Sequence, residues 1–391
     1  MGRTVGAIIF IFLITTFAWF ILAASITSRT TESASELGSR VSATWGAPQT
    51  QTPPRASVIT QVVDNKPQYV VLPIERSRIN VALDLDQRQK GLLWFATYRV
   101  DFHGDYILRN TTDQDEITLL LTFPVAGAIY DNLVLRVDGQ PVQLTTVDDG
   151  VSTVIHRPSG TPFRVEVGYR SQGHSRWSYS FGSGVAQVRD SQLDMRTNFH
   201  AIDFPTGTLS PTEKKEVGNG WQLSWRYTNI VTGYEIGMVM PEKLQPGPLA
   251  GRISMFAPVS LLFFFFVMFL IATLRNIDLH PMHYFFLATS FFSFHLLLAY
   301  LVDHISIHLA FAICSAVSIF LVVSYLRVVV SPKFALREAA IAQFVYLVLF
   351  SYAFFFKGFT GLAITIGAIA SLFIAMQATA RVNWRTQTAE A

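Results

Sequence analysis

Histidine offers the widest range of chemistry in this sequence, and nine histidines are spread along its 391 residues. Two groups are compact: the run His280-Pro281-Met282-His283, and Asp303-His304 with His308. His304 and His308 are four residues apart, so on a helix they would share a face and, with Asp303, offer three ligands to a metal. Because three ligands without a fixed geometry make a weak site, we favour turn-forming and interfacial roles and expect no metal or other cofactor.

Among His, Asp, Glu, Lys and Arg, His295 is the only residue well inside an apolar stretch of the sequence. Transporters and proton pumps usually carry carboxylates or basic residues inside their membrane spans, where these groups line the path. The apolar stretches of this sequence contain no carboxylate, Lys or Arg. We therefore interpret His295 as a packed side chain hydrogen-bonded to a neighbouring helix, with a proton-relay role as the alternative.

The polar middle of the chain has no pattern typical of a catalytic site. It lacks the nucleophile-elbow, zinc-protease and phosphate-loop motifs. Asp190 and Asp194 are interpreted as solvated carboxylates, and the aromatic alternation Trp177–Phe181 as buried strand residues rather than a glycan-binding face. The sequence therefore predicts no catalytic residue and no enzyme. The histidines of this region have no metal-ligand spacing: His103, His156, His174 and His200.

Six stretches without Lys, Arg, Asp or Glu are each about as long as a bilayer is thick, since a spanning helix needs about 20 apolar residues. One lies at the N-terminus and five lie together near the C-terminus, so the sequence predicts an N-terminal transmembrane anchor over residues 1–25 and a five-helix transmembrane bundle over residues 253–380. The stretches are Thr4–Ser28, Ile253–Leu274, Leu279–Val302, His304–Leu326, Ala339–Phe356 and Gly358–Ala380.

Positive charge flanks the cytoplasmic ends of membrane helices. With six crossings, this rule places both termini and a short tail over residues 381–391 in the cytoplasm, and the polar middle of the chain outside. The opposite short loops hold only Lys357. The first apolar stretch is longer than a usual signal-peptide core, so we favour an uncleaved anchor. The charges that set this orientation are Arg3, Arg275, Arg327, Lys333, Arg337, Arg381 and Arg385.

Between the membrane segments, residues 26–56 are rich in Ser, Thr, Ala and Pro and predict a flexible tether. Residues 57–250 instead alternate apolar and polar side chains with period two, as at Tyr98, Val100 and Phe102, and carry Asp-Gly and Asn-Gly turn signals. This pattern predicts a periplasmic all-β, sandwich-like domain, in one piece or two. The fold class is thus a mixed membrane protein. The single cysteine, Cys314, lies in a predicted membrane helix, so this domain has no disulfide.

Rows of small residues at spacing four appear on two predicted membrane helices. Such rows let another backbone approach closely. We favour packing within the bundle over a docking face for a partner protein. The rows are Ser306, Ala310, Cys314 and Ser318 on the fourth crossing, and Ala363, Gly367, Ser371, Ala375 and Thr379 on the last.

The run Leu279–Tyr284, continued by Leu296–Leu298 and Asp303-His304, resembles the bacterial inner membrane protein CreD family. The resemblance covers residues 254 to about 384 and implies an N-terminal anchor, a large periplasmic domain and a C-terminal helical bundle. It also implies a role in cell-envelope integrity with no established catalytic activity. The residues it marks as candidates are His280, Pro281, Met282, Asp303 and His304.

The sequence thus favours a non-enzymatic protein of the bacterial inner membrane, whose periplasmic β-domain binds an envelope component or partner. One alternative is a receptor that passes a periplasmic signal to a separate cytoplasmic protein. The other is a transporter or enzyme acting on lipid or envelope precursors. Membrane lipids are expected partners. The near-neutral charge of the β-domain argues against nucleic acid.

Overall fold

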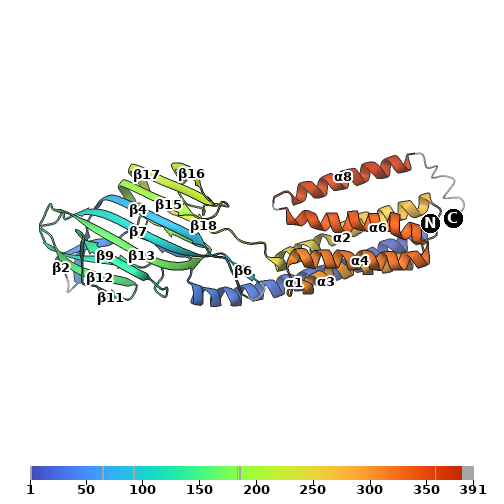
Figure 1. Cartoon of the computed structure of the whole chain (residues 1–391), viewed down its shortest axis with the longest axis horizontal. Coiled ribbons are helices and arrows are strands. Elements are labelled where there is room, and N and C mark those ends of the chain that lie inside the picture. The colour runs from blue at the N-terminus through green and yellow to red at the C-terminus, as the bar shows by residue number, and fades with distance from the viewer. Residues whose placement is uncertain are drawn as a thin grey trace. The chain divides into compact units, whose positions relative to one another are not determined.

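The computed structural model describes residues 2–63, 66–90, 93–182, 184, 186–356 and 358–380. The chain divides into two compact units. We call residues up to Ser35, together with those from Leu244 onward, the helical unit, and Glu36–Lys243 the β unit. The mixed fold class predicted from the sequence is confirmed: a long N-terminal helix, a β-rich middle and apolar C-terminal helices (Figure 1).

The β unit is built mainly from an eight-stranded and a five-stranded sheet (Figure 1). The larger sheet, in the order β10-β9-β13-β7-β4-β15-β17-β16, contains β4 (Ile74–Leu85), β7 (Thr97–Arg109), β9 (Asp131–Val137), β10 (Gln140–Pro141), β13 (Pro162–His174), β15 (Ala186–Thr197), β16 (Glu213–Val217) and β17 (Gly220–Thr232). The smaller sheet, in the order β11-β12-β8-β2-β3, contains β2 (Arg55–Val63), β3 (Lys66–Val71), β8 (Glu116–Thr122), β11 (Thr145–Val147) and β12 (Gly150–His156).

Two small sheets complete the β unit. One has three strands, β1 (Gln49–Gln51), β14 (Arg176–Tyr179) and β18 (Ile236–Val239), and the other pairs β5 (Arg88–Lys90) with β6 (Leu93–Phe95). Pairing is antiparallel except between β15 and β4 and between β1 and β14.

One hydrophobic core joins the two large sheets. Tyr98, Val100 and Phe102 of β7 are buried, as their period-two spacing predicted, and they share this core with Leu119 of β8. Trp177 is fully buried in the same core, which supports its interpretation as a strand residue rather than a glycan-binding one. The β unit is therefore one sandwich, which answers a question that the sequence left open.

The N-terminal helix corrects the prediction of a flexible tether over residues 26–56. Helix α1 (Gly2–Trp45) continues well beyond the predicted anchor, and β1 and β2 follow it directly. Threonine hydroxyls bond to carbonyls one turn back, as Thr30 does to Ile26, and Arg40 pairs with Glu36 at 2.6 Å. These local contacts support a polar helix. It ends at Gly46, whose φ of +89° favours glycine.

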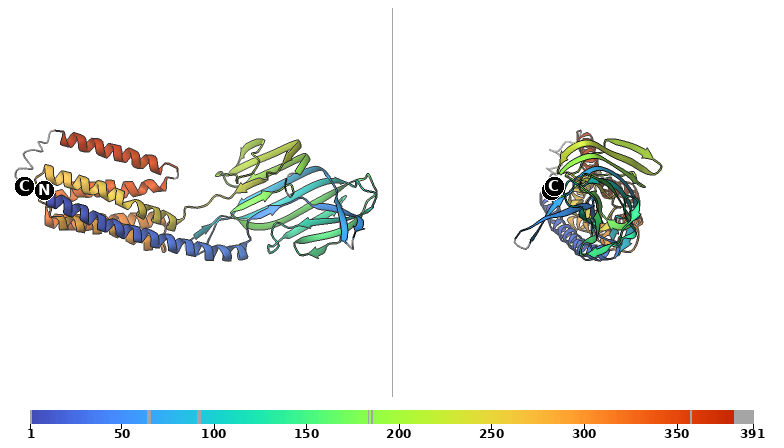
Figure 2. Two further views of the ribbon diagram at one scale, coloured as in Figure 1. Left: turned by 180° about the vertical axis from the view of Figure 1, so that it is seen from behind. Right: turned by 90° about the vertical axis from the view of Figure 1, so that its left-hand side faces the viewer.

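The helical unit contains six helices within the described ranges that are long and apolar enough to cross a membrane (Figure 2). Besides α1, these are α2 (Pro246–Leu274), α3 (Pro281–Leu301), α4 (Ile307–Val329), a composite span from Pro332 to Phe355, and α8 (Thr360–Thr379). The composite span consists of α5 (Pro332–Phe334), η1 (Ala335–Ala339), α6 (Ala340–Gln343), η2 (Phe344–Leu349), α7 (Phe350–Tyr352) and η3 (Ala353–Phe355).

The composite span starts earlier than the predicted stretch Ala339–Phe356. Ser331 accepts a hydrogen bond from the backbone N–H of Phe334 at 3.2 Å, and Pro332 occupies the first helical position. A serine cap followed by proline is a strong helix start. The segment 327–337 is consequently mostly helical.

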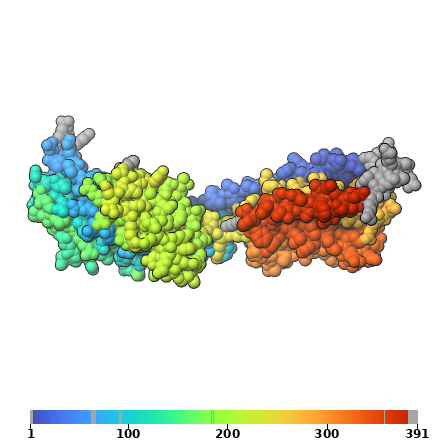
Figure 3. Space-filling view, turned by 90° about the horizontal axis from the view of Figure 1, so that it is seen from above, coloured from blue at the N-terminus to red at the C-terminus, as the bar shows by residue number. Residues whose placement is uncertain are grey.

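Helix α8 lies on the surface of this unit (Figure 3). It differs from the other helices that are long enough to cross a membrane because Ala375 is its only buried residue. The prediction that its small-residue row packs closely against the bundle is wrong for Ala363 and Gly367, which are exposed, and holds at Ala375. The corresponding row on α4 is confirmed within the helix, because Ala310, Cys314 and Ser318 are all fully buried, whereas Ser306 precedes the helix and is exposed.

Candidate functional site

The run predicted to be functional at the start of α3 builds a helix end. The ring of His280 caps the helix by accepting a hydrogen bond from the backbone N–H of Met282 at 3.3 Å, and Pro281 follows as the first helical residue. His283 is hydrogen-bonded to the hydroxyl of Tyr325 on α4 at 2.7 Å. Met282 itself is 49% exposed. These contacts fix the start of α3 and its position against α4.

The second predicted group lies in the turn between α3 and α4. Asp303 forms an ion pair with Arg29 of α1, whose guanidinium also lies 5.1 Å from the centre of the Tyr300 ring. His308 packs against Phe355, with 5.2 Å between ring centres. Within the described ranges, no group of three or more His, Cys, Asp or Glu side chains is placed to hold a metal ion. Asp303 therefore ties α1 to this turn.

The two groups do not form one site. They lie at opposite ends of α3, whose 21 residues span about 30 Å at helical rise. His280, Pro281 and Met282 thus lie at one end of the helix, while Asp303 and His304 lie at the other.

His295 is fully buried between these ends. Its Nδ1 lies 3.1 Å from the carbonyl oxygen of Phe291, and its ring contacts Trp19 of α1 with 5.8 Å between centres. Since a carbonyl only accepts, Nδ1 carries the proton, and Nε2 is left as an acceptor. Neither Nε2 nor the Trp19 indole N–H has a hydrogen-bond partner among the described residues. Aromatic packing between α1 and α3 is the role that this arrangement supports.

A groove of about 520 Å³ on the larger sheet of the β unit was not predicted from the sequence. Its volume lies in the range of small-ligand sites, roughly 300–1,000 Å³. Strands β4, β7, β9 and β13 contribute side chains, together with the segment that leads into β9. The lining residues are Asp84, Arg99, Val100, Asp101, Ile129, Asp131, Arg170, Ser171 and Gln172.

Ion pairs position both arginines of the groove. Arg170 Nε lies 2.9 Å from Asp101 Oδ2, and Arg99 lies 3.3 Å from Asp86 at the edge. Hydrogen bonds from Arg88 and, to a lesser degree, Arg99 hold the pKa of Asp86 below its usual range. That carboxylate stays ionised near neutral pH and keeps Arg99 in place.

Two groove carboxylates remain available to a ligand. Asp84 and Asp131 form no ion pair within the described part of the chain, although Asp131 accepts a hydrogen bond from the backbone N–H of Asn132. Ile129 adds an apolar surface that is 68% exposed. The groove can therefore accept hydrogen bonds from a cationic or polar group while its arginines donate to an anionic one.

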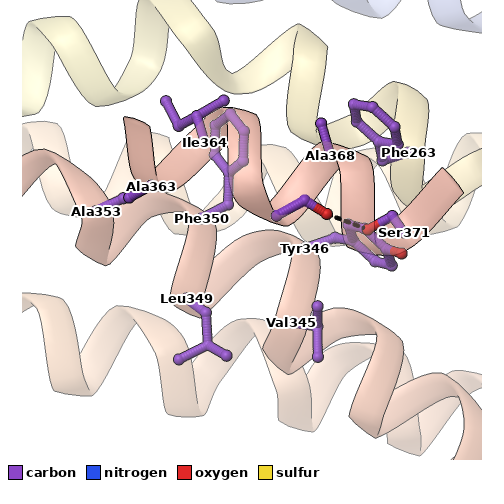
Figure 4. Close-up of a pocket in the computed structure, with 11 residues that line it drawn as sticks. Phe263, Val345, Tyr346, Leu349, Phe350, Ala353, Ala363, Ile364, Ala368 and Ser371 are labelled. Carbon is purple, nitrogen blue, oxygen red and sulfur yellow. Dashed lines mark hydrogen bonds between the residues drawn. The ribbon is translucent and has the colours of Figure 1, made fainter. Parts of the chain in front are cut away.

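A second hollow lies in the helical unit between α8 and the composite span, with α2 at one side (Figure 4). It has a volume of about 190 Å³ and an almost wholly apolar lining. The lining residues are Phe263, Val345, Tyr346, Leu349, Phe350, Ala353, Ala363, Ile364, Gly367, Ala368 and Ser371.

Six apolar helices and a β-sandwich unit with a polar groove define a mixed, multi-spanning membrane protein. Residues 247–385, about a third of the chain, match the family model described as "Inner membrane protein CreD". The C-terminal helical region therefore carries the pattern of this inner membrane protein family, which confirms the resemblance seen in its sequence. No curated protein matches the chain in sequence.

Solved structures show only weak likeness. A Legionella pneumophila protein described provisionally as nutrient-binding has 9% identity and a TM-score of 0.36, over 49% of this chain and 71% of its own. The M1 zinc metallopeptidase of Deinococcus radiodurans has 9% identity and a TM-score of 0.28, over 43% of this chain and 42% of the peptidase. Likeness at this level carries no conclusion about activity.

Proposed function

We propose that this protein is a non-enzymatic component of the inner membrane that supports cell-envelope integrity, and that its β unit binds an envelope component or partner in the periplasm. The observation that carries the proposal is the groove on the larger sheet, because it combines ligand-site volume with two carboxylates, Asp84 and Asp131, that have no ion pair among the described residues. The CreD pattern of the helical region adds support for the inner membrane and for the envelope role.

The proposal also fixes an orientation. Arg275, Arg327 and Arg337 lie at one end of the bundle helices, in the segments where positive charge is retained on the cytoplasmic side. Both termini are then cytoplasmic, and the β unit faces the periplasm, where envelope components are within reach of the groove. In this arrangement His280, Pro281 and Met282 act at the cytoplasmic end of α3, and Asp303 and His304 at the periplasmic end.

The test replaces the two free carboxylates of the groove in the full-length protein. A host strain that lacks its own copy is complemented with wild type, with the pair Asp84→Asn and Asp131→Asn, or with the control pair Asp113→Asn and Asp115→Asn. Both control residues are exposed and lie outside the groove. The two pairs change the same net charge, so that a difference between them reports the groove.

Survival in detergent and after osmotic shock is the readout, with protein level checked by immunoblot. We expect the groove pair to lose the protection that wild type restores and the control pair to keep it. Full protection by the groove pair at normal protein level would refute ligand binding at this groove. A chain without the β unit that still protects would refute any binding role of the unit.

A further inference from the structure

We propose that the hollow beneath α8 holds one acyl chain of a membrane phospholipid, as a site distinct from the groove of the β unit. The proposal concerns the helical unit alone and goes beyond the function proposed above. It starts from the exposure of α8, whose only buried residue is Ala375.

The two walls of the hollow leave a real gap. On the α8 side the lining residues are small except for Ile364, with Ala363, Gly367 and Ser371 among the small ones. A Cβ atom added at Gly367 would meet no other heavy atom within 4 Å. On the opposite wall Phe263 and Tyr346 stack nearly parallel, with an interplanar angle of 6° and 6.2 Å between ring centres. Two aromatic rings thus border a strip of α8 in which Ile364 is the only large side chain of the lining (Figure 4).

The volume of the hollow limits the size of the molecule that it can hold. A cavity of about 150 Å³ lined by apolar side chains accepts a molecule as large as benzene and stays dry. The 190 Å³ of this hollow therefore admits a run of methylene groups and excludes a second helix, whose diameter with side chains is about 10 Å. Water is disfavoured because the hollow offers few polar partners.

The location of the hollow, beside an apolar helix, makes a lipid acyl chain available to fill it. Ala363 to Ser371 lie within an apolar helix of 20 residues that is long enough to cross a membrane. Around such a helix the abundant apolar molecules are lipid tails, which are as apolar as leucine side chains. An empty gap forfeits dispersion contacts on every wall. A tail between α8 and the composite span restores those contacts and gives α8 the packing that its small residues do not provide.

The experiment compares two identical glycine substitutions on α8. Gly367→Leu places a branched side chain in the hollow, whereas Gly361→Leu makes the same change nearer the start of α8, at a residue that does not line it. Both replace a glycine of α8 by leucine, although Gly361 lies in the first turn and Gly367 in the interior, where the change in helix propensity is larger. Each full-length protein is purified in mild detergent, and retained phospholipid is counted by native mass spectrometry.

We expect wild type and Gly361→Leu to retain one phospholipid and Gly367→Leu to retain about tenfold less, or about 1.4 kcal/mol in binding free energy. Equal retention by all three proteins would overturn the proposal. A dimer that is present in wild type and lost in Gly367→Leu, without a change in lipid, would overturn it in favour of a second copy.

A labelling experiment on the wild type avoids any dependence on the variants. A phosphatidylcholine carrying a diazirine in the middle of its acyl chain is photolysed with the protein in nanodiscs, and adducts are mapped by peptide sequencing. Adducts concentrated on Phe263, Tyr346 and residues 363–371 would support the proposal. Adducts spread evenly over the outward faces of α8 and α4 would overturn it.

Discussion

Two helices of the same unit carry rows of small residues at the same spacing, with opposite outcomes. On α4 the row is closed: Ala310, Cys314 and Ser318 are fully buried. On α8 the row borders a hollow, and only Ala375 is buried. Small side chains permit close approach of two helices, and they do not by themselves cause it.

Polar contacts between helices account for the difference. Ser318 donates a hydrogen bond to the carbonyl oxygen of Ser290 on α3 at 2.6 Å and accepts one from the Gln343 amide of the composite span at 2.8 Å. Ser371 on α8 donates only to the carbonyl of Gly367 in its own helix. Hydrogen bonds of Ser318 thus join α4 to both α3 and the composite span, whereas Ser371 of α8 forms no hydrogen bond to another helix within the described ranges.

The largest expected difference in unfolding free energy is between two variants that place a large side chain in each row of small residues. Ala310→Phe introduces a ring where the helices already touch, and overpacking of this kind costs about 1–3 kcal/mol or more. Ala363→Phe points into the hollow and should change the free energy of unfolding by less than about 0.5 kcal/mol. Thermal unfolding in one detergent measures both. Equal destabilisation by the two variants would show that the α8 row is as closed as the α4 row.

Removing the row serines should give a smaller contrast. Ser318→Ala leaves the buried Gln343 amide without its acceptor and should cost about 1 kcal/mol, within the range of hydrogen bonds between membrane helices. Ser371→Ala removes only a bond within α8 and should be close to neutral. Denaturant unfolding of the two variants tests this. A neutral Ser318→Ala would mean that apolar packing alone closes the α4 row.

A third prediction isolates the contact between Ser318 and Gln343. The Oε1 atom of Gln343 has no partner among the described residues, so Gln343→Leu removes a polar group that is only half satisfied. Replacing both partners of a buried hydrogen bond costs less than removing one. In a double-mutant cycle, Ser318→Ala should therefore cost less when Leu occupies position 343, with a coupling of about 0.5–1 kcal/mol. Strict additivity would contradict the proposed contact.

The sequence predicted what local patterns encode. Charge-free stretches marked all six apolar helices, and period two marked the buried face of β7.

The site depended on pairings that spacing cannot reveal. Asp303 meets Arg29 across 274 positions, and Asp190 meets Arg76 and Arg78 across more than 110. Asp190 was interpreted as a solvated carboxylate, and hydrogen bonds from both arginines lower its pKa. The groove likewise needs β4, β7 and β13 side by side. A hint existed in the charges that alternate with the core residues of β7, Arg99 and Asp101 among them, because they mark one densely charged sheet face.

The smallest expected effect comes from Gly367→Ala, which changes the backbone freedom of this position without filling the hollow beside it. Gly367→Ala adds one methyl group in open space, since the added Cβ meets nothing within 4 Å. Alanine restricts the unfolded backbone and suits a helix interior, so the variant should gain about 0.5 kcal/mol in unfolding free energy. Its methyl group is too small to fill a hollow of 190 Å³, and phospholipid retention should stay at the wild-type level. Thermal unfolding and native mass spectrometry on one preparation measure both quantities. A loss of stability would mean that a neighbouring helix already touches this face of α8, and the contrast between the two rows would then be one of degree.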